Sequence, residues 1–135
     1  MKININQIPA EGLILNEEIF PSLLDLDTEI VRLNEPIKIT AHITKITNAV
    51  TVDLTLGCLI YMVCSRCLNE YKLDLKKNLR LNYQANGKQS RIIDLNPDIR
   101  EEIILDYPIR PLCSPDCKGL CVKCGKNLNE GQCNC

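Results

Sequence analysis

Residues 113–135 read CSPDCKGLCVKCGKNLNEGQCNC, and this stretch holds six of the nine cysteines in the chain. A smaller cluster, Cys64-Ser65-Arg66-Cys67, lies near the middle of the sequence. Cysteines gathered this densely can serve as disulfides, a redox pair, an iron–sulfur cluster or a zinc site. The choice among these four uses decides most of what the sequence says about fold and function.

The spacing of the last four cysteines favours zinc. Cys121 and Cys124 are separated by two residues, so both thiolates can point at one ion. Gly125 follows them and can take the positive φ with which a chain leaves such a turn. Cys133 and Cys135 bring two more thiolates back after a short loop. The sequence therefore predicts one zinc site made of four cysteines at the end of the chain.

A second set of four then remains: Cys64, Cys67, Cys113 and Cys117. In this preferred pairing a second zinc ion joins the tail to the middle of the chain. In a rival pairing, the four cysteines of residues 113–124 share one ion, and Cys64 and Cys67 are left free or redox-active. We prefer the first pairing, with two zinc ions, because it leaves no C-x-x-C pair without a role.

The expected compartment also argues against disulfides. The first twelve residues, MKININQIPAEG, contain no apolar core of the kind found in secretory signals. No apolar run approaches the roughly 18 residues of a membrane span. We therefore expect a cytoplasmic protein without a membrane partner, and thiols stay reduced in the cytoplasm.

The composition fits one domain with a modest core. The chain has 135 residues, of which 45% are hydrophobic and only 4% aromatic, so the core must be built mainly from Ile, Leu and Val. Structural zinc contributes roughly 10–16 kcal/mol in small peptides, which is comparable to the whole stability of a typical domain. We expect a β-rich domain over residues 1–107 and a zinc-binding tail over residues 108–135 packed on it.

Alternating apolar and polar residues predict three long strands in succession, over residues 37–44, 50–63 and 71–83. Cys64 to Cys67 then lie at the turn between the last two strands, where they form a rigid knuckle. Strands joined by short turns imply an antiparallel arrangement. The predicted fold class is mainly β, an antiparallel meander or barrel-like sheet, with one or two short helices and a C-terminal cysteine-rich tail.

The segments around these strands are less sharply defined. Residues 2–8 alternate like a short strand, and residues 22–35 form an acidic link with some helical character. Asn86-Gly87 predicts a turn. A helix is expected to begin at Pro97, capped by Asp94 or Asn96.

The net charge of −1 hides a segregated distribution. Residues 64–91 carry seven bases and two acids, whereas residues 92–107 carry one base and five acids. Lys72, Lys76 and Arg80 recur on one face of a strand, and a row of cations suits a phosphate backbone. The candidate RNA-binding residues are Arg66, Lys72, Lys76, Lys77 and Arg80.

A simpler interpretation of the same row remains open. Lysines on an exposed edge strand protect it from pairing with other chains. Tyr71 and Tyr83 could stack on bases, but their place in the alternation puts them on the core side. An isoelectric point near 5.8 also argues against tight non-specific binding to nucleic acid.

No catalytic arrangement is evident, so we expect the protein not to be an enzyme and to have no small-molecule substrate. His42 is the only histidine and falls on the polar face of a strand, where we expect it to be exposed and inert. A thiol oxidoreductase using Cys64 and Cys67 is the main alternative, but such a site needs the first cysteine at a helix N-terminus. Cys58 falls on an apolar strand face and is most simply a core residue.

Three segments resemble the YceD-like family: Cys64-Ser65-Arg66-Cys67-Leu68, residues 108–113, and CKGLCVKCGKNLNEGQCNC. Members of this family are described as large-ribosomal-RNA accumulation proteins of bacteria and plastids. The resemblance covers about residues 50–135, and one departure is Val122, where the family often has proline. Some members lack the last four cysteines, which implies that the mid-chain site is the shared one.

The resemblance implies a non-enzymatic role in accumulating or assembling large-subunit ribosomal RNA. Its implied partner is ribosomal RNA or, alternatively, a ribosomal protein or assembly factor for which the chain is an adaptor. It does not identify the contact surface or the oligomeric state.

Overall fold

The computed structural model describes residues 1–85 and 91–135, so the turn predicted at Asn86-Gly87 lies outside the described residues. Most of the regular structure is β-strand, with one α-helix in the described ranges. The strands are β1 (Lys2–Asn4), β2 (Leu13–Ile19), β3 (Val31–Arg32), β4 (Ile37–Ile46), β5 (Ala49–Val63), β6 (Glu70–Gln84) and β7 (Ile92–Asp94), and the helix is α1 (Asn96–Leu105).

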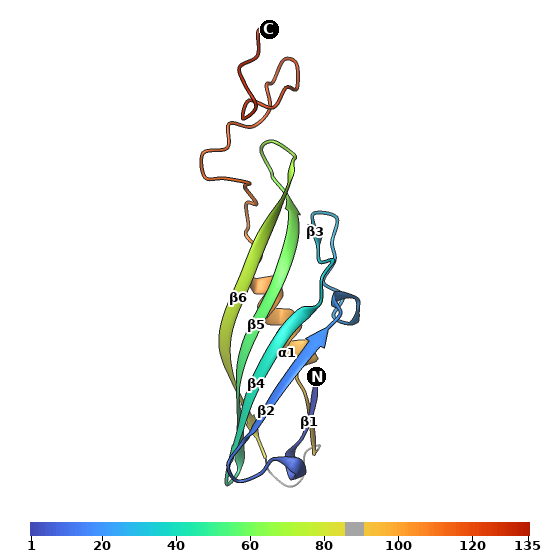
Figure 1. Ribbon diagram of the computed structural model, residues 1–135, viewed down its shortest axis with the longest axis vertical. Coiled ribbons are helices and arrows are strands. Elements are labelled where there is room, and N and C mark those ends of the chain that lie inside the picture. The colour runs from blue at the N-terminus through green and yellow to red at the C-terminus, as the bar shows by residue number, and fades with distance from the viewer. Residues whose placement is uncertain (86–90) are drawn as a thin grey trace.

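Five strands form one antiparallel sheet (Figure 1). β4, β5 and β6 follow one another as a meander, β2 pairs with the other side of β4, and the short β3 pairs with the far end of β5. β1 and β7 make a separate two-stranded pair. The predicted fold class is confirmed, and the described part of the sheet is open, with β2 and β6 at its edges.

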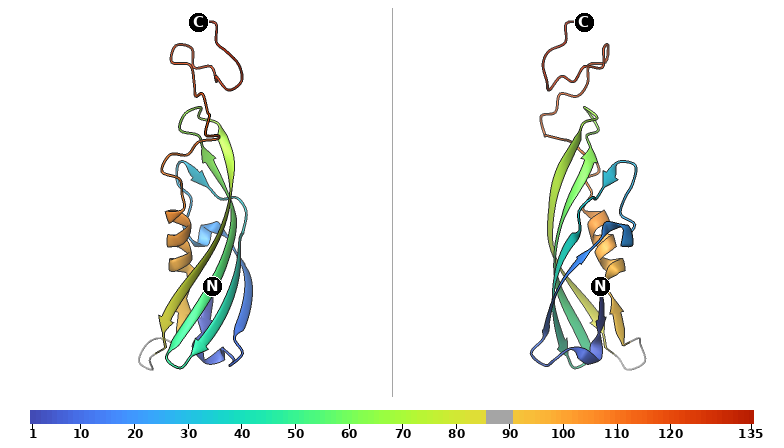
Figure 2. Two further views of the ribbon diagram at one scale, coloured as in Figure 1. Left: turned by 90° about the vertical axis from the view of Figure 1, so that its left-hand side faces the viewer. Right: turned by 45° about the vertical axis from the view of Figure 1, so that its right-hand side comes forward.

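One face of the sheet carries the hydrophobic core, because the alternation of β5 is regular over its whole length. Its even-numbered residues from Val50 to Met62 are all buried, while its odd-numbered residues point to the opposite, outer face. Helix α1 covers the inner face, where Ile99 and Ile103 are fully buried (Figure 2). None of the described elements covers the outer face.

The N-terminal segments differ from the prediction. The strand predicted over residues 2–8 ends at Asn4, because the Asn4 side chain accepts a hydrogen bond from the Asn6 backbone and starts a 3-10 turn. The helical character predicted for residues 22–35 amounts to a 3-10 turn at Pro21–Leu23. β3 lies in the same link, and its two residues are too few to produce a periodic signal.

Helix α1 begins at Asn96, one residue before the predicted start. The predicted cap, Asp94 or Asn96, is wrong, because the N-cap residue is Leu95, which makes no side-chain cap hydrogen bond. Asp94 does accept a hydrogen bond from the Asn96 backbone N–H at 3.0 Å, just before the helix. The helix is tied to β6 by the Tyr83 hydroxyl, which donates to Asp98, and by Lys77, which lies 2.8 Å from Glu102. No helix in the described ranges is long and apolar enough to cross a membrane.

The tail after α1 runs along the sheet to the β5–β6 turn and continues beyond it, so the molecule is elongated with the C-terminus at one tip (Figure 1). Apart from a single β-bridge between Leu120 and Asn127, this tail has no regular secondary structure. Its fold must therefore be held by side chains, above all by cysteines.

Candidate metal centres

The sulfur atoms of eight cysteines lie in two groups. The proximal quartet is Cys64, Cys67, Cys113 and Cys117, and the distal quartet is Cys121, Cys124, Cys133 and Cys135. Within each quartet all four sulfurs lie within 4.8 Å of one another. The structure therefore groups the cysteines as the preferred pairing does, and Cys64 and Cys67 do not stand apart as the rival pairing requires.

The distances suit a single tetrahedral ion better than disulfides. All nine cysteines lie in the described ranges and all are free thiols. Zinc–sulfur bonds of about 2.3 Å place the sulfurs of a tetrahedron about 3.8 Å apart. In the proximal quartet, Cys64 and Cys117 are 3.8 Å apart and Cys67 and Cys113 are 3.6 Å apart. The distal sulfurs are slightly closer, at 3.3–3.4 Å. Both quartets are thus positioned to hold a metal ion.

The proximal quartet joins the β5–β6 turn to the tail. Leu68, just after the second cysteine of the turn, donates its N–H to the Cys64 carbonyl at 3.0 Å and has φ of +59°. The Ser65 N–H donates to Pro111 of the tail at 2.8 Å. Strand β5 leads into this turn and β6 leads out, so Cys64 is not at the helix N-terminus that a thioredoxin-like site needs. Three of the four cysteines are at most 3% exposed: Cys64, Cys67 and Cys117.

Two further contacts hold the tail against the turn. The Arg66 guanidinium donates to the Cys117 carbonyl at 3.0 Å. Gly119 has φ of +76°, and a Cβ at that position would lie 3.3 Å from the Arg66 carbonyl oxygen. Glycine is therefore needed at residue 119 both for its backbone conformation and for the close approach.

The distal quartet repeats the same turn with different residues. Gly125 donates its N–H to the Cys121 carbonyl at 2.8 Å and has φ of +75°, so the positive φ predicted for Gly125 is confirmed. The Cys121 N–H in turn donates to the Lys126 carbonyl at 2.8 Å. Unlike the proximal quartet, this one has no fully buried member, since Cys124 and Cys135 are exposed and Cys121 and Cys133 half-buried.

Backbone amides prepare one thiol of each quartet to ionise. Burial opposes ionisation of Cys64, but N–H groups of Cys67, Cys113 and Arg66 outweigh it and lower the Cys64 pKa to about 6. The N–H groups of Cys124 and Lys123 likewise lower the pKa of Cys121 to about 6.

Another thiol of each quartet has a raised pKa. Hydrogen bonds with Cys67 and Cys117 raise the pKa of Cys113 to about 12. Hydrogen bonds with Cys121 and Cys133 raise the pKa of Cys135 to about 11. In each quartet the protein stabilises the ionised form of some thiols but not of others. A bound cation would stabilise the remaining thiolates, as in a thiolate metal site.

One residue that the sequence did not single out touches a quartet. The Asn129 side chain donates from Nδ2 to the Cys117 sulfur at 3.3 Å, and this hydrogen bond lowers the pKa of Cys117. An asparagine in a polar loop carries no sequence signal for such a role, because the contact depends on how the tail folds back.

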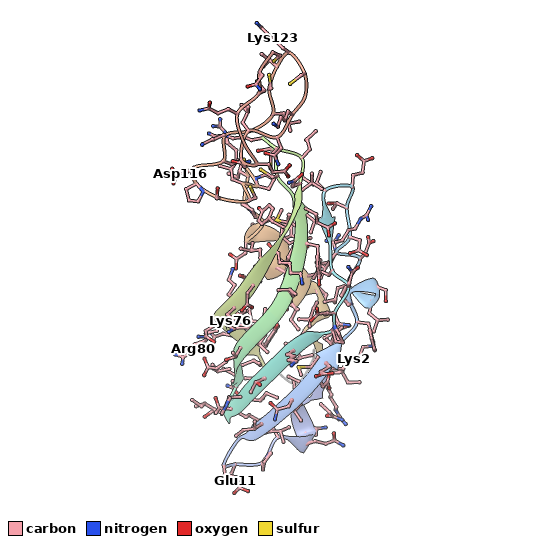
Figure 3. The ribbon with its side chains drawn as sticks, turned by 45° about the horizontal axis from the view of Figure 1, so that its top comes forward. Lys2, Glu11, Lys76, Arg80, Asp116 and Lys123 are labelled. Atoms are coloured by element: carbon pink, nitrogen blue, oxygen red, sulfur yellow. The ribbon has the colours of Figure 1, made fainter. Side chains whose placement is uncertain are left out.

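The predicted RNA-binding residues fall in three places. Lys72, Lys76 and Arg80 share the outer face of β6, and Figure 3 shows Lys76 and Arg80 projecting side by side from this strand. Lys77 points to the inner face, where it pairs with Glu102 and with Asp106. Arg66 lies in the β5–β6 turn, where its guanidinium supports Cys117.

Neighbouring side chains affect how freely Lys72, Lys76 and Arg80 could contact a ligand. Lys76 is 79% exposed and lies 3.5 Å from Asp74. Arg80 pairs with Asp53 on β5, and its Nη2 lies 3.2 Å from a carboxylate oxygen. Lys72 lies 5.4 Å from the ring centre of Tyr61. A shallow depression of about 490 Å³ adjoins the row and includes His42, Asp53, Thr55, Asn78 and Arg80.

Two residues of this face were missed in the sequence. Tyr61 is the aromatic residue that points outward from β5, whereas Tyr71 and Tyr83 pack against the core as predicted. Lys38 of β4 is aligned with Lys76 across Gly57. Strand alternation could have placed Tyr61, but the pairing of Lys38 depends on register.

The remaining predictions concern single residues. Cys58 is 5% exposed and belongs to the main core, as predicted. Burial raises its pKa to about 11, which keeps the thiol protonated. His42 is exposed on the outer face, also as predicted.

Comparison with known proteins finds one family that the C-terminal part of the chain resembles. Residues 87–135 match the family model described as Large ribosomal RNA subunit accumulation protein YceD. The resemblance to the YceD-like family is confirmed. The matched residues include α1, the tail and both pairs of the distal quartet, while the β5–β6 turn lies outside them.

Two plant proteins that carry the family's name match part of the chain. The protein named Large ribosomal RNA subunit accumulation protein YCED homolog 1, chloroplastic, of Zea mays is 37% identical over 70 residues, which is 51% of this chain and 23% of the relative. Its namesake of Arabidopsis thaliana is 44% identical over 43 residues, or 32% of this chain and 13% of the relative.

A bacterial relative matches more of the chain at lower identity. An uncharacterized protein of Mycobacterium leprae is 24% identical over 133 residues, which is 87% of this chain and 61% of the relative. The chain thus spans less than a quarter of the two plant relatives and less than two thirds of the mycobacterial one. No solved structure matches the chain.

Proposed function

We propose that this protein is a non-enzymatic cytoplasmic factor in the accumulation of large-subunit ribosomal RNA, and that two zinc ions organise its tail. The observation that carries the proposal is the pair of cysteine quartets on a chain whose C-terminal part matches a family model named for that process. The chain's own role in that process is inferred from the family, since it spans only part of its relatives.

Zinc is the metal that this donor set favours. Four thiolates in a tetrahedral arrangement suit zinc or iron, and the sulfurs here are close enough to share one ion. An iron–sulfur cluster would hold its ligands further apart, because its own iron and sulfide atoms lie between them. The ion supplies a fixed tetrahedral anchor, and the chain supplies the turns at Cys64 and Cys121 that aim sulfurs at it.

We propose further that ribosomal RNA is contacted by the outer face of the sheet. A zinc ion with four thiolates has a net charge of about −2, and Lys118, Lys123 and Lys126 offset part of this charge, so the metal-bearing tip would present little net charge to phosphate. The outer face is uncovered and carries Lys72, Lys76 and Arg80 on β6 and Lys38 on β4. Tyr61 lies on the same face and offers a ring for a base.

Binding to fragments of large-subunit ribosomal RNA across a salt series tests this contact. Each lysine or arginine that meets a phosphate contributes about 0.7–0.9 to the slope of log K against log salt. Replacing Lys72, Lys76 and Arg80 by Ala is expected to reduce that slope by about 2–3. The matched control replaces Lys2, Lys45 and Arg91, which are exposed outside this face and both quartets, and removes the same charge.

Two results would contradict direct RNA contact by this face. One is the absence of measurable binding of the wild-type protein at low salt. The other is an equal loss of slope in the control variant, which would show that net charge and not the outer face governs binding.

A protein-interaction adaptor is the second candidate, and the free edge of β6 favours it. This edge strand is 15 residues long, whereas typical strands have about 5–6. Among the described strands only β5 pairs with it, so backbone groups along its other edge carry no sheet partner there. An extended segment of a ribosomal protein or assembly factor could add to this edge as a further strand.

A pull-down with and without nuclease separates the two candidates. If the protein is an adaptor, its ribosomal partner remains bound after RNA is digested. Loss of every ribosomal partner on digestion favours RNA contact instead.

A further inference from the structure

Asn129 links the two quartets, although it belongs to neither. It lies in the loop between the two cysteine pairs of the distal quartet, yet its Nδ2 donates to the sulfur of Cys117 in the proximal quartet at 3.3 Å. Its Oδ1 accepts from the Lys118 backbone N–H at 2.8 Å. The Asn129 amide therefore joins the distal loop to the chain at Cys117 and Lys118 through two hydrogen bonds.

The position of Asn129 depends on its own loop. The Leu128 N–H donates to the Gly119 carbonyl at 2.9 Å, and Asn129 contacts the Asn127 side chain through both its backbone N–H and its Nδ2. The loop leaves the first cysteine pair after Cys124 and returns to the second at Cys133. The closeness of the distal sulfurs therefore brings the two ends of this loop together.

Cys117 is thus held from two directions. The Arg66 guanidinium from the β5–β6 turn donates to its carbonyl oxygen at 3.0 Å, and Asn129 from the distal loop donates to its sulfur. The contact with Arg66 depends on the position of the β5–β6 turn, and the contact with Asn129 depends on the position of the distal loop. Asn129 is thus a side-chain route from the distal loop to a proximal ligand, beside the short chain segment that joins Cys117 to Cys121.

We propose that Asn129 is a positioning residue that couples the two sites, so that a thiophilic divalent metal bound by the distal quartet raises the affinity of the proximal quartet. This inference rests on the proposed metal binding. Because linkage is reciprocal, metal in the proximal quartet strengthens distal binding by the same factor. Partners that hydrogen-bond to metal ligands typically change metal affinity by about 10–100-fold when removed, which sets the expected size of the coupling.

Competition for Zn²⁺ between the reduced, metal-free protein and a chromophoric chelator tests the coupling. Four proteins form a cycle: the wild type, Asn129→Ala, a distal-dead variant with Cys121→Ser and Cys133→Ser, and the distal-dead variant with Asn129→Ala. Asn134→Ala is the matched control, because this asparagine is exposed between Cys133 and Cys135. Hydrogen exchange of β4 and β5 reports whether each variant keeps its sheet.

We expect Asn129→Ala to weaken the proximal site about 10-fold or more in the otherwise wild-type chain. The distal-dead variant is expected to weaken it by a similar factor, and adding Asn129→Ala to that variant should then change little. Asn134→Ala should leave the proximal affinity unchanged.

Two outcomes would overturn the coupling. In one, Asn129→Ala leaves the proximal affinity unchanged in a chain that binds two ions. In the other, Asn129→Ala causes the same loss in both backgrounds, which would make its contact with Cys117 independent of the distal loop. A wild-type chain that binds no metal at all would instead contradict the proposed metal binding itself.

Discussion

The proximal and distal quartets use the same turn to do different structural work. In the proximal quartet, Cys67 and Cys113 are 46 residues apart in the sequence, whereas Cys121 and Cys135 of the distal quartet are 14 apart. The proximal sulfurs are mostly buried at the end of a sheet, and the distal sulfurs are partly exposed in a tail without regular structure.

These differences in loop length and burial indicate that the proximal quartet supports the fold as a whole, whereas the distal quartet supports the tail. Closing the longer loop costs about 1 kcal/mol more chain entropy, so preformed structure would help the proximal quartet to bind an ion. The β5–β6 turn provides that structure, and Tyr71, Leu112 and Leu120 pack around the proximal sulfurs. An ion bound by the distal quartet would close a shorter loop, and we expect it to depend less on the sheet.

The largest expected effect comes from breaking the proximal quartet. Cys67→Ser removes one ligand, releases the tail from the β5–β6 turn and exposes Leu112 and Leu120. We expect a loss on the order of several kcal/mol in the free energy of unfolding, since structural zinc contributes about 10–16 kcal/mol in small peptides. Hydrogen exchange should rise both in the tail and at the Cys64 end of β5 and β6.

Breaking the distal quartet is expected to have a smaller and more local effect. Cys121→Ser should increase hydrogen exchange over residues 121–135 while the sheet keeps its protection. The same exchange experiment on both variants compares the quartets directly. Equal loss of protection in the sheet for both would contradict the division of work between them.

Two glycines offer a finer comparison. Gly119→Ala and Gly125→Ala both place a side chain at positive φ, which costs about 1 kcal/mol or more. At residue 119 the new Cβ also meets the Arg66 carbonyl, whereas at residue 125 it meets nothing within 4 Å. We therefore expect Gly119→Ala to destabilise tail docking more than Gly125→Ala, measured as the midpoint of chemical denaturation. A reversed order would show that the tail does not rest on Arg66 as the structure has it.

The smallest effect concerns the thiol outside both quartets. Burial raises the pKa of Cys58 from 9.0 to about 11, so the folded state favours the neutral thiol. Its contribution to stability is complete below about pH 9 and is lost as the pH rises towards 11. Replacing Cys58 with Ala should flatten the fall in stability between these two pH values. An unchanged pH profile would contradict the burial of this thiol.

The sequence predicted the strands and the quartets for related reasons. β4, β5 and β6 show regular alternation because one face packs on the core, and cysteine spacing records which thiolates one ion can reach. β3 escaped prediction because its pairing with β5 is long-range and only two residues long. Asn129 and Lys38 escaped because their contacts arise from how the chain folds back and from strand register, which no local pattern encodes.

We propose that each quartet holds one zinc ion. Elemental analysis of the purified, reduced protein, combined with X-ray absorption at the zinc edge, tests it most directly. We expect two zinc ions per chain, each surrounded by four sulfur atoms at about 2.3 Å. A chain without zinc, or one whose zinc has fewer than four sulfur neighbours, would contradict it.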